Sequence, residues 1–355
     1  MPAKGSVSTR IENSERNTLS DGASSTPRLI ITIDTEEEGL WSGRFRPTGN
    51  TVQNIQRLPR FQSLCDRLGI RPVYLIDAPV VQDHRASDVL AQIHSDGRCE
   101  IGAHVHPWCN PPIDEFHDQQ ESYLCNIPVD RQQAKIEWLT NAIGERFGKR
   151  PVSFRCGRYG LDIAGARLLA ANGYSVDSSV IPFTNYSADG GPDFTNAPWQ
   201  PYRVGDEDLT VPGIGGDLLE VPVGVGFNRA NFARAMKFQQ LAGKRPFRWL
   251  KMEGILDRLG IVRRIKLSPE QADARAMQRL IDCYCSGKQA PVLVMMFHST
   301  SLSPGHSPYV RDEQQLDRFL RRIEDTVEYS AHKHSAACCT LDELTDFGKT
   351  SSCTH

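Results

Sequence analysis

Two short clusters of side chains have the residue types and the spacing of a metal-dependent hydrolytic site. Asp34 and Glu36 are separated by one residue, and so are His104 and His106. In an extended segment, residues i and i+2 point to the same side, so each pair can face one point. Two imidazoles and one carboxylate form a three-ligand site that leaves a fourth position for water. The sequence therefore predicts a divalent metal, with Zn²⁺ favoured and Co²⁺, Ni²⁺ or Fe²⁺ also compatible with these ligands.

The two carboxylates of the first cluster need not have the same role. One can bind the ion while its neighbour accepts a proton from a metal-bound water, whose pKa the ion lowers. His298, much later in the chain, could serve as a proton donor. Glu37 and Glu38 extend the acidic run, and for them we expect solvated positions at the start of a loop or helix.

The residues that surround these clusters predict a repeated strand–helix order. Short β-branched runs predict strands at 29–33, 72–76, 99–106, 152–155, 174–180, 291–297 and 337–341. Helical patterns lie between them at 51–69, 86–96, 130–147, 162–172 and 312–330. Parallel strands with helical crossovers, as a barrel or a doubly wound sheet, satisfy this order. The reactive side chains follow the strands, at the carboxyl ends where such folds bind their ligands.

The domain organisation follows from composition. Residues 1–27 contain hardly any large apolar side chain and predict a disordered N-terminal tail. Residues 28–349 predict one α/β domain that includes a long insertion at 182–288, and 350–355 predict a flexible C-terminal tail. A net charge of −2 does not resemble a nucleic-acid binder. Because neither a signal peptide nor a long apolar run is found, we expect a cytoplasmic protein.

A basic stretch within the insertion stands out from the rest of the chain. Residues 228–266 hold eleven Lys or Arg against Glu253 and Asp257, together with Phe232, Phe238 and Trp249. This composition fits peripheral contact with an anionic membrane at its inner face, or binding of an anionic glycan intermediate. A solvated helical face that balances the acidic remainder is the alternative interpretation.

Five segments together resemble the motifs of polysaccharide deacetylases, the NodB-homology group of carbohydrate esterase family 4. They are T-I-D-T-E at 32–36, G-A-H-V-H-P-W at 102–108, F-R-C-G-R-Y-G at 154–160, V-D-S-S-V at 176–180 and F-H-S at 297–299. The segment P-G-H-S-P-Y at 304–309 makes the likeness closest to the WalW-type branch. The likeness spans residues 28–347.

The resemblance implies a distorted (β/α) barrel of about seven strands and metal-assisted removal of an N-acetyl group from a sugar by attack of metal-bound water. It places Asp34 on the catalytic base and His104 and His106 on the metal-binding histidines. Arg155 falls on the arginine that orients the base, His298 on the general acid, and Asp177 on the aspartate paired with that acid.

The sequence also departs from the family pattern. Thr35 stands where the family commonly has a second, metal-binding aspartate, so the carboxylate ligand is assigned to Glu36 one residue later. The two histidines are commonly separated by three residues, and here by one. The tryptophans that are usual in the fourth motif are missing.

Three further residues are candidates for substrate binding. Trp108 could stack on a sugar ring, or could be buried and support the metal loop. Arg158 could bind an acidic substrate group, or could pair with a structural carboxylate. A backbone N–H near Arg158 or Tyr159 is expected to stabilise the oxyanion.

The expected partner is an N-acetylated glycan, and no oligomeric state is predicted. Two other functions fit the same residues. One is hydrolysis of a C–N bond in a small amide or cyclic ureide, and the other is a catalytically silent glycan-binding barrel.

Overall fold

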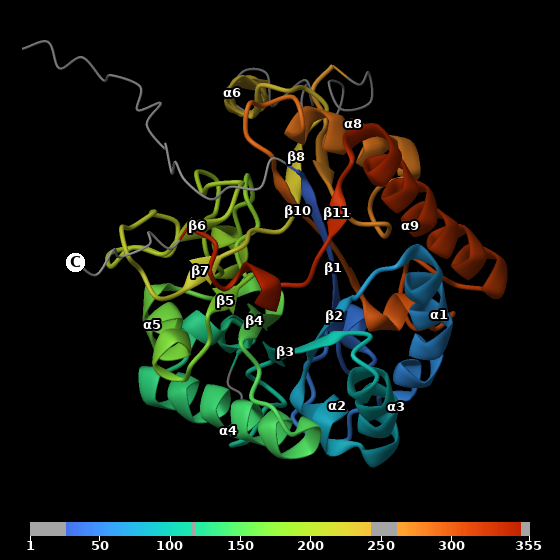
Figure 1. The fold of residues 1–355 in the computed structure, drawn as a ribbon. Helices are drawn as coiled ribbons and strands as arrows, with labels where there is room; N and C mark the ends of the chain where they lie inside the picture. The colour runs from blue at the N-terminus through green and yellow to red at the C-terminus, as the bar shows by residue number, and fades with distance from the viewer. Residues whose placement is uncertain (1–25, 116–117, 243–260, 349–355) are drawn as a thin grey trace, which may run out of the picture.

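The computed structural model describes residues 26–115, 118–242 and 261–348. Most of the predicted N-terminal tail, the C-terminal tail at 350–355 and part of the basic stretch, 243–260, lie outside the described residues. A curled sheet forms the centre of the molecule, and helices surround it (Figure 1). No helix in the described ranges combines the length and the apolar character needed to cross a membrane.

The sheet has the strand order β10-β1-β2-β3-β4-β5-β7-β6, with β11 paired to β1. All of its pairs are parallel except β6 with β7. The strands are β1 (Arg28–Thr35), β2 (Val73–Ile76), β3 (Glu100–Val105), β4 (Ser153–Cys156), β5 (Val176–Asp177), β6 (Tyr202–Arg203), β7 (Leu219–Glu220), β10 (Val292–His298) and β11 (Ala337–Cys338). The predicted distorted α/β barrel is confirmed.

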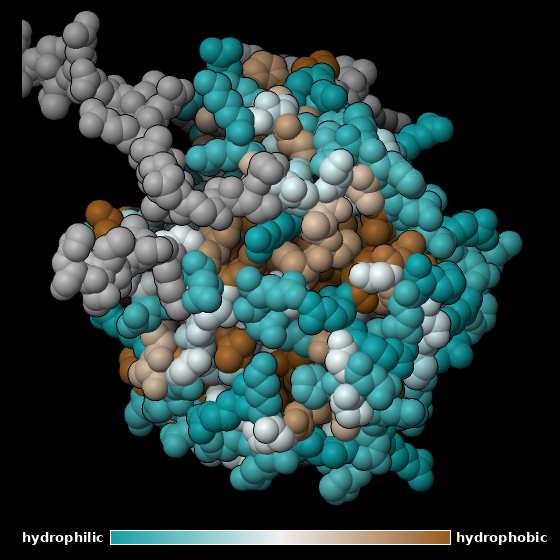
Figure 2. Space-filling model, in the orientation of Figure 1, coloured by the Kyte–Doolittle hydropathy of each residue, from teal (hydrophilic) through white to brown (hydrophobic). Residues whose placement is uncertain are grey.

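The crossover helices lie outside the sheet, and on the face drawn in Figure 2 their outer sides are mainly hydrophilic. They are α1 (Leu58–Leu68), α2 (Ala78–Gln82), α3 (His84–Ser95), α4 (Val129–Phe147), α5 (Ile163–Ala171), α8 (Ala274–Tyr284) and α9 (Glu313–His334). Aspartate side chains accept backbone N–H bonds at the starts of α2, α3, α5, α8 and α9. Such caps satisfy N–H groups that have no partner within the helix.

Short 3₁₀ helices connect these elements: η1 (Leu40–Ser42), η2 (Gln53–Arg57), η3 (Gln119–Ser122), η4 (Leu124–Asn126), η5 (Gly157–Tyr159), η6 (Ser187–Asp189), η8 (Ser299–Leu302) and η9 (Asp342–Leu344). Of these, η2 occupies the first part of the helix expected at 51–69.

The pattern of β1 explains how one strand serves both the core and the site. Leu29, Ile31 and Ile33 belong to the large apolar cluster that includes residues of the surrounding helices. Ile30 belongs to a second, smaller cluster formed by residues of other strands of the sheet together with Leu341 and Leu344 near the C-terminal end of the described chain. Because successive side chains of a strand alternate, Asp34 points to the same side as Ile30, toward the centre of the curled sheet.

The insertion contributes to the wall of the barrel. Its strands β8 (Val225–Phe227) and β9 (Arg264–Lys266) form an antiparallel pair, and α6 (Phe232–Ala242) follows β8. Next to this pair, Gly224 N donates to Val294 O at 3.0 Å, and Met296 N donates to Leu267 O at 3.1 Å. These bonds occupy the edge of β10 that does not face β1. Because Leu267 is bonded to β10 in this way, residues 268–272 lie next to the carboxyl end of β10.

Candidate metal and catalytic site

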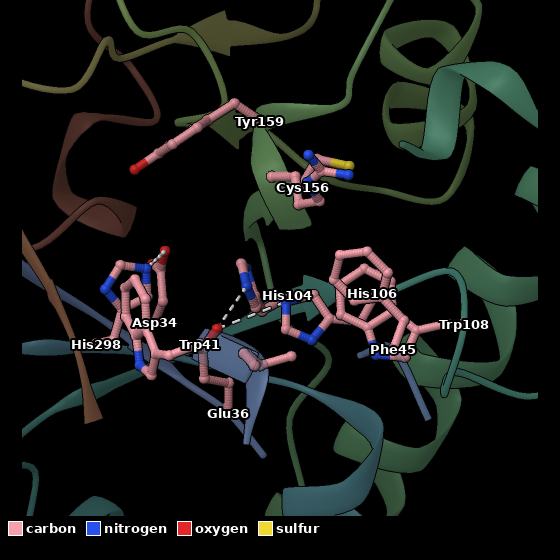
Figure 3. A pocket seen from close by; sticks show the side chains of 12 residues that line it. Asp34, Glu36, Trp41, Phe45, His104, His106, Trp108, Cys156, Tyr159 and His298 are labelled. Atoms are coloured by element: carbon pink, nitrogen blue, oxygen red, sulfur yellow. Dashed lines mark ion pairs between the residues drawn. The ribbon is translucent and has the colours of Figure 1, made fainter. Parts of the chain in front are cut away.

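One pocket brings together the clusters that are far apart in the sequence. It is lined by Asp34, Glu36, Leu40, Trp41, Phe45, His104, His106, Trp108, Cys156, Arg158, Tyr159 and His298 (Figure 3). The strand register explains the convergence, because Asp34 pairs with His298 across β1 and β10. In the same way, His104 pairs with Arg155 across β3 and β4.

Glu36, His104 and His106 form a buried cluster with the geometry of a metal site. One ligand atom from each lies within 4.8 Å of the other two. Glu36 Oε2 is 3.5 Å from Nε2 of both histidines, and Glu36 Oε1 is buried without a hydrogen-bond partner among the described residues. Burial and the neighbouring carboxylates raise the pKa of Glu36 well above its usual range. A cation bound by the Glu36 carboxylate and the two Nε2 atoms would provide a partner for the unpaired oxygen and would compensate the buried negative charge. These residues therefore fit a divalent metal.

The other ring nitrogen of each histidine contacts a group that can only accept a hydrogen bond. His104 Nδ1 is 2.9 Å from Arg155 O, and His106 Nδ1 is 2.8 Å from Glu37 Oε2. Both Nδ1 atoms therefore carry the proton, and the Nε2 lone pairs face the cluster. Burial is the main cause that lowers the pKa of His104 to about 3 and that of His106 to about 4, which keeps both rings neutral.

Glu37 is not solvated, contrary to the expectation from the acidic run. Its side chain is buried, and besides His106 it accepts a bond from Trp108 Nε1 at 2.7 Å. Its backbone N–H donates to Asp77 Oδ2 at 2.8 Å, and Asp77 also caps α2. Glu37 therefore lies behind the metal cluster. In this position its carboxylate accepts hydrogen bonds from the ring N–H groups of His106 and Trp108, which would otherwise be buried without partners.

Glu38 was also expected to be solvated, and it too has specific partners. Its Oε1 accepts from Asn54 N at 2.7 Å and its Oε2 from Thr51 Oγ1 at 2.6 Å. His306 Nδ1 lies 3.2 Å from the same Oε1. These contacts connect the loop after β1 with residues 51–54 and with the loop that follows η8.

Asp34 is held as a carboxylate by an arginine that is fully buried. Arg155 Nη1 donates to Asp34 Oδ1 at 2.7 Å, and its Nε donates to Ser178 O at 2.8 Å. Burial acts to raise the pKa of Asp34, but the positive charge of its surroundings, above all that of Arg155, outweighs burial and holds that pKa well below its usual range. Asp34 is therefore ionised throughout the physiological pH range.

His298 pairs with a carboxylate that the sequence did not indicate. Its Nδ1 lies 2.9 Å from Glu270 Oε2, and Glu270 Oε1 accepts from Ser301 Oγ at 2.6 Å. Burial acts to lower the pKa of His298, yet Glu270 raises it above its ordinary value. On the other side of the ring, His298 Nε2 is 3.9 Å from Asp34 Oδ2.

Asp177 does not have the position that the resemblance implied. Its Oδ1 accepts from Ser179 Oγ at 2.6 Å, and its other charged neighbour is Glu220 on the adjacent strand β7. Burial raises the pKa of both carboxyls. The pairing of Asp177 with His298 is therefore corrected: Glu270 is the partner, because the insertion brings residue 270 to the end of β10.

The turn that follows β4 forms another wall of the pocket. Arg158 and Tyr159 both have positive φ angles, 53° and 59°, which non-glycine residues rarely adopt. A Cβ on Gly157 would lie 2.2 Å from His106 Cδ2, so only glycine allows the turn to approach the metal cluster this closely. Lys266 Nζ donates to Tyr159 Oη at 2.8 Å and fixes the far end of that ring.

Aromatic side chains line the rest of the pocket. The Trp41 ring meets the His298 ring edge-on at 5.1 Å and is 39% exposed. Trp108 is only 3% exposed and stacks on His106 at 4.3 Å, while Phe45 lies 4.4 Å from Trp108. Of the two interpretations for Trp108, the geometry favours support of the metal loop. Trp41 has the exposure that stacking on a sugar requires.

The residues that sequence reasoning missed are of two kinds. Asp77 comes directly after β2, just as Asp34 lies at the end of β1. The rule that site residues follow strands could therefore have identified Asp77. Glu270, Lys266 and Trp41 lie in loops or in the insertion, where no periodic pattern relates them to the site.

Comparisons with known proteins support the fold. No protein-family model matches the sequence, and no curated protein matches it either. A putative polysaccharide deacetylase from Mycobacterium smegmatis has a similar structure, with a TM-score of 0.51 and 15% sequence identity, over 92% of this chain and 90% of that one.

Two further solved structures share the architecture. A putative glycoside hydrolase/deacetylase from Parabacteroides distasonis gives a TM-score of 0.58 at 12% identity, covering 91% of this chain and 71% of that one. A 4-alpha-glucanotransferase from Thermococcus litoralis gives 0.52 at 13% identity, covering 91% of this chain but 41% of that one. At these identities the likeness shows a common fold, which this chain shares with a structure described as a putative polysaccharide deacetylase and with structures of other description.

Proposed function

We propose that this protein is a metal-dependent hydrolase that removes an N-acetyl group from a sugar in a polysaccharide or a glycan-biosynthesis intermediate. The observation that carries the proposal is the arrangement of a carboxylate and a histidine beside a three-ligand cluster. Asp34 Oδ2 and His298 Nε2 lie 3.9 Å apart in the pocket that also contains Glu36, His104 and His106. This combination supplies a proton acceptor, a proton donor and a metal site at one place.

The proposed ligands of the metal are Glu36, His104 and His106, and Zn²⁺ is the ion that such ligands favour, with Co²⁺, Ni²⁺ or Fe²⁺ as alternatives. When bound, the ion would polarise the acetyl carbonyl and lower the pKa of the attacking water enough for a weakly basic carboxylate to take its proton. The contacts of both Nδ1 atoms leave the Nε2 lone pairs directed to the place that the ion would occupy.

Asp34 is the proposed general base. Arg155 fixes the orientation of its carboxylate through Oδ1 and leaves Oδ2 on the side of His298. Arg155 itself is fixed by bonds to Thr32 and Ser178, so the base has a single orientation. Its low pKa means that it is available as an acceptor at every physiological pH.

His298 is the proposed general acid, and Glu270 positions it. A protonated His298 can donate from Nε2 to the amine nitrogen, which cannot leave as an anion. Glu270 contacts Nδ1 and raises the pKa of the ring, which favours the protonated form before the reaction. The backbone N–H groups of Arg158 and Tyr159, in their unusual conformation, are the proposed donors to the oxyanion.

The test is metal analysis of the purified protein, with acetate release measured over a panel of N-acetylated glycans before and after chelation. We expect about one divalent ion per chain and acetate release that chelation abolishes and added metal restores. Turnover that is insensitive to chelation would contradict the proposal.

Three predictions from the sequence accompany this function. The likeness to the WalW-type branch rests on residues 304–309. The cytoplasmic location rests on the lack of a long apolar run in the sequence, and the membrane contact on the basic stretch 228–266. In α6, the exposed Phe238 and Leu241 support the last of these. Sedimentation with anionic but not neutral vesicles would support peripheral membrane contact.

A further inference from the structure

The guanidinium of Arg158 lines the candidate pocket and has most of its donors available. Its Nη1 donates to Ser122 Oγ and, at 3.4 Å, to Gln119 O. Both acceptors are neutral, and no ion pair with a carboxylate is found for this arginine among the described residues. A guanidinium has five N–H donors in one plane, and the bonds to Ser122 and Gln119 use only Nη1. Among the described residues, the Tyr123 hydroxyl is the one further hydrogen-bond partner of this side chain, so Nε and Nη2 donors remain for a ligand.

Arg158 is also held in a defined position. Its guanidinium carbon lies 4.0 Å from the centre of the Tyr123 ring and 5.3 Å from that of Phe45, so two aromatic rings orient the cation. Its backbone has a φ of 53°, in the left-handed region. Such a conformation in a residue other than glycine is maintained by its surroundings and is common at ligand-binding positions.

The negative charges near the pocket already have partners. Asp34 pairs with Arg155, and Glu270 pairs with His298. Glu36 belongs to the metal cluster. Within the described part of the chain, Arg158 is therefore a cation without a carboxylate counter-ion, and it would be desolvated when a substrate fills the pocket. Desolvation of an unpaired charge is unfavourable, whereas a substrate that carries its own anion would compensate it.

We propose that the substrate is an N-acetylated sugar that carries an anionic group, a carboxylate or a phosphate, which Arg158 binds through the donors of Nε and Nη2. This inference rests on the proposed deacetylase function and adds the class of sugar to it. The planar fork of arginine matches both anions in a two-point contact, which a neutral hydroxyl cannot reproduce.

The test compares one sugar with and without the anion. Acetate release is measured for N-acetylglucosamine, its 1-phosphate, its 6-phosphate and the corresponding uronic acid. We expect kcat/KM of at least one anionic form to exceed that of the neutral sugar by roughly 10- to 100-fold, the range of a charge-assisted contact. The phosphate and carboxylate arms distinguish the two sources of the anion.

The variants Arg158→Gln and Arg158→Gly should both reduce this preference by at least about tenfold. Glycine adopts the left-handed backbone conformation of residue 158 without strain, so Arg158→Gly should fold even if Arg158→Gln does not. Arg167→Gln is the matched control, because Arg167 is an exposed arginine that also donates to a backbone oxygen, that of Asp206. The ratio of kcat/KM for anionic and neutral sugars in Arg167→Gln should equal that of the wild-type protein.

A binding measurement separates failure of this inference from failure of the proposed function. Calorimetry with the same four sugars, on chelator-treated protein, should show tighter binding of an anionic sugar by the wild type and no such gain in Arg158→Gln. Equal affinities and equal kcat/KM values for neutral and anionic sugars would overturn the anion inference and leave deacetylation standing. Absence of acetate release from every sugar would count against deacetylation, and the affinities would then decide on the anion alone.

Discussion

At the level of single residues, Glu36 and Glu37 lie on opposite sides of the His106 imidazole. Glu36 faces Nε2 of His106 at 3.5 Å, and Glu37 contacts Nδ1 of the same ring at 2.8 Å. A carboxylate behind a metal-binding histidine fixes its tautomer and increases its basicity. His104 has only a backbone carbonyl in that place, so the two histidines are not equivalent.

Glu37→Gln should weaken metal binding by roughly 10- to 100-fold, because the negative charge behind His106 is lost while the shape of the side chain is kept. The affinity can be measured by competition with a chromophoric chelator. Trp108 fluorescence offers a second readout, because its ring stacks on His106. Glu38→Gln is the control, since Glu38 contacts Thr51, Asn54 and His306. Equal metal affinities in the two variants would contradict this role of Glu37.

Glu270→Gln should shift the alkaline limb of the pH–rate profile to lower pH. The glutamate raises the pKa of His298, and an acid catalyst is active only below its pKa. Activity is therefore lost as the pH rises through the pKa of His298, and removal of the negative charge brings that loss to a lower pH. Asp177→Asn tests the alternative from the family pattern. A shift of the alkaline limb in Asp177→Asn and none in Glu270→Gln would reverse the assignment.

At the level of elements, the turn from β4 into η5 must pass close to His106. Gly157→Ala would place a methyl group 2.2 Å from His106 Cδ2 and 2.8 Å from Val105 O, so the ring or the turn must move. We expect loss of metal affinity and at least a tenfold loss of kcat/KM, because displacements of about 1 Å at a site have such effects. Gly287→Ala is the control, because its nearest neighbour is 4.0 Å away. Unchanged metal affinity in Gly157→Ala would show that the approach is not required.

At the level of the whole molecule, one further buried carboxylate, Glu100, lies at the opposite end of the sheet from the site. Glu100, at the start of β3, accepts bonds from Leu341 N at 2.8 Å and Asp342 N at 3.0 Å. Burial, with a contribution from Asp342, raises its pKa to about 7. A group whose pKa is raised on folding favours the folded state when protonated, so its contribution declines as the pH rises from about 4.5 to about 7.

Glu100→Gln should remove this pH dependence, because the amide oxygen can still accept both N–H bonds and carries no charge. Relative to the wild type, the variant should gain on the order of 1–3 kcal/mol in free energy of unfolding between pH 5 and pH 8. Urea unfolding at the two pH values measures the difference. Glu328→Gln, an exposed position on α9, provides the baseline. If the free energies of unfolding of the wild type and Glu100→Gln differed by the same amount at pH 5 and at pH 8, the raised pKa of Glu100 would be contradicted.

The sequence by itself determined the parallel α/β order and the segments that meet at the site. Strand periodicity identifies β1, β3 and β10, and parallel strands place their carboxyl ends together whatever the details of packing. The convergence of Asp34, Glu36, His104, His106 and His298 in one pocket follows from that rule. Their catalytic roles stay predictions that the experiments above address.

Only the tertiary structure decided which groups stand behind these residues. Glu37 turns inward because His106 and Trp108 offer buried donors, which an acidic run in a sequence does not reveal. Glu270 replaces Asp177 beside His298 because the insertion bonds to the free edge of β10. Such partners come from loops without periodic patterning, and their positions depend on long-range packing, so local sequence rules cannot locate them.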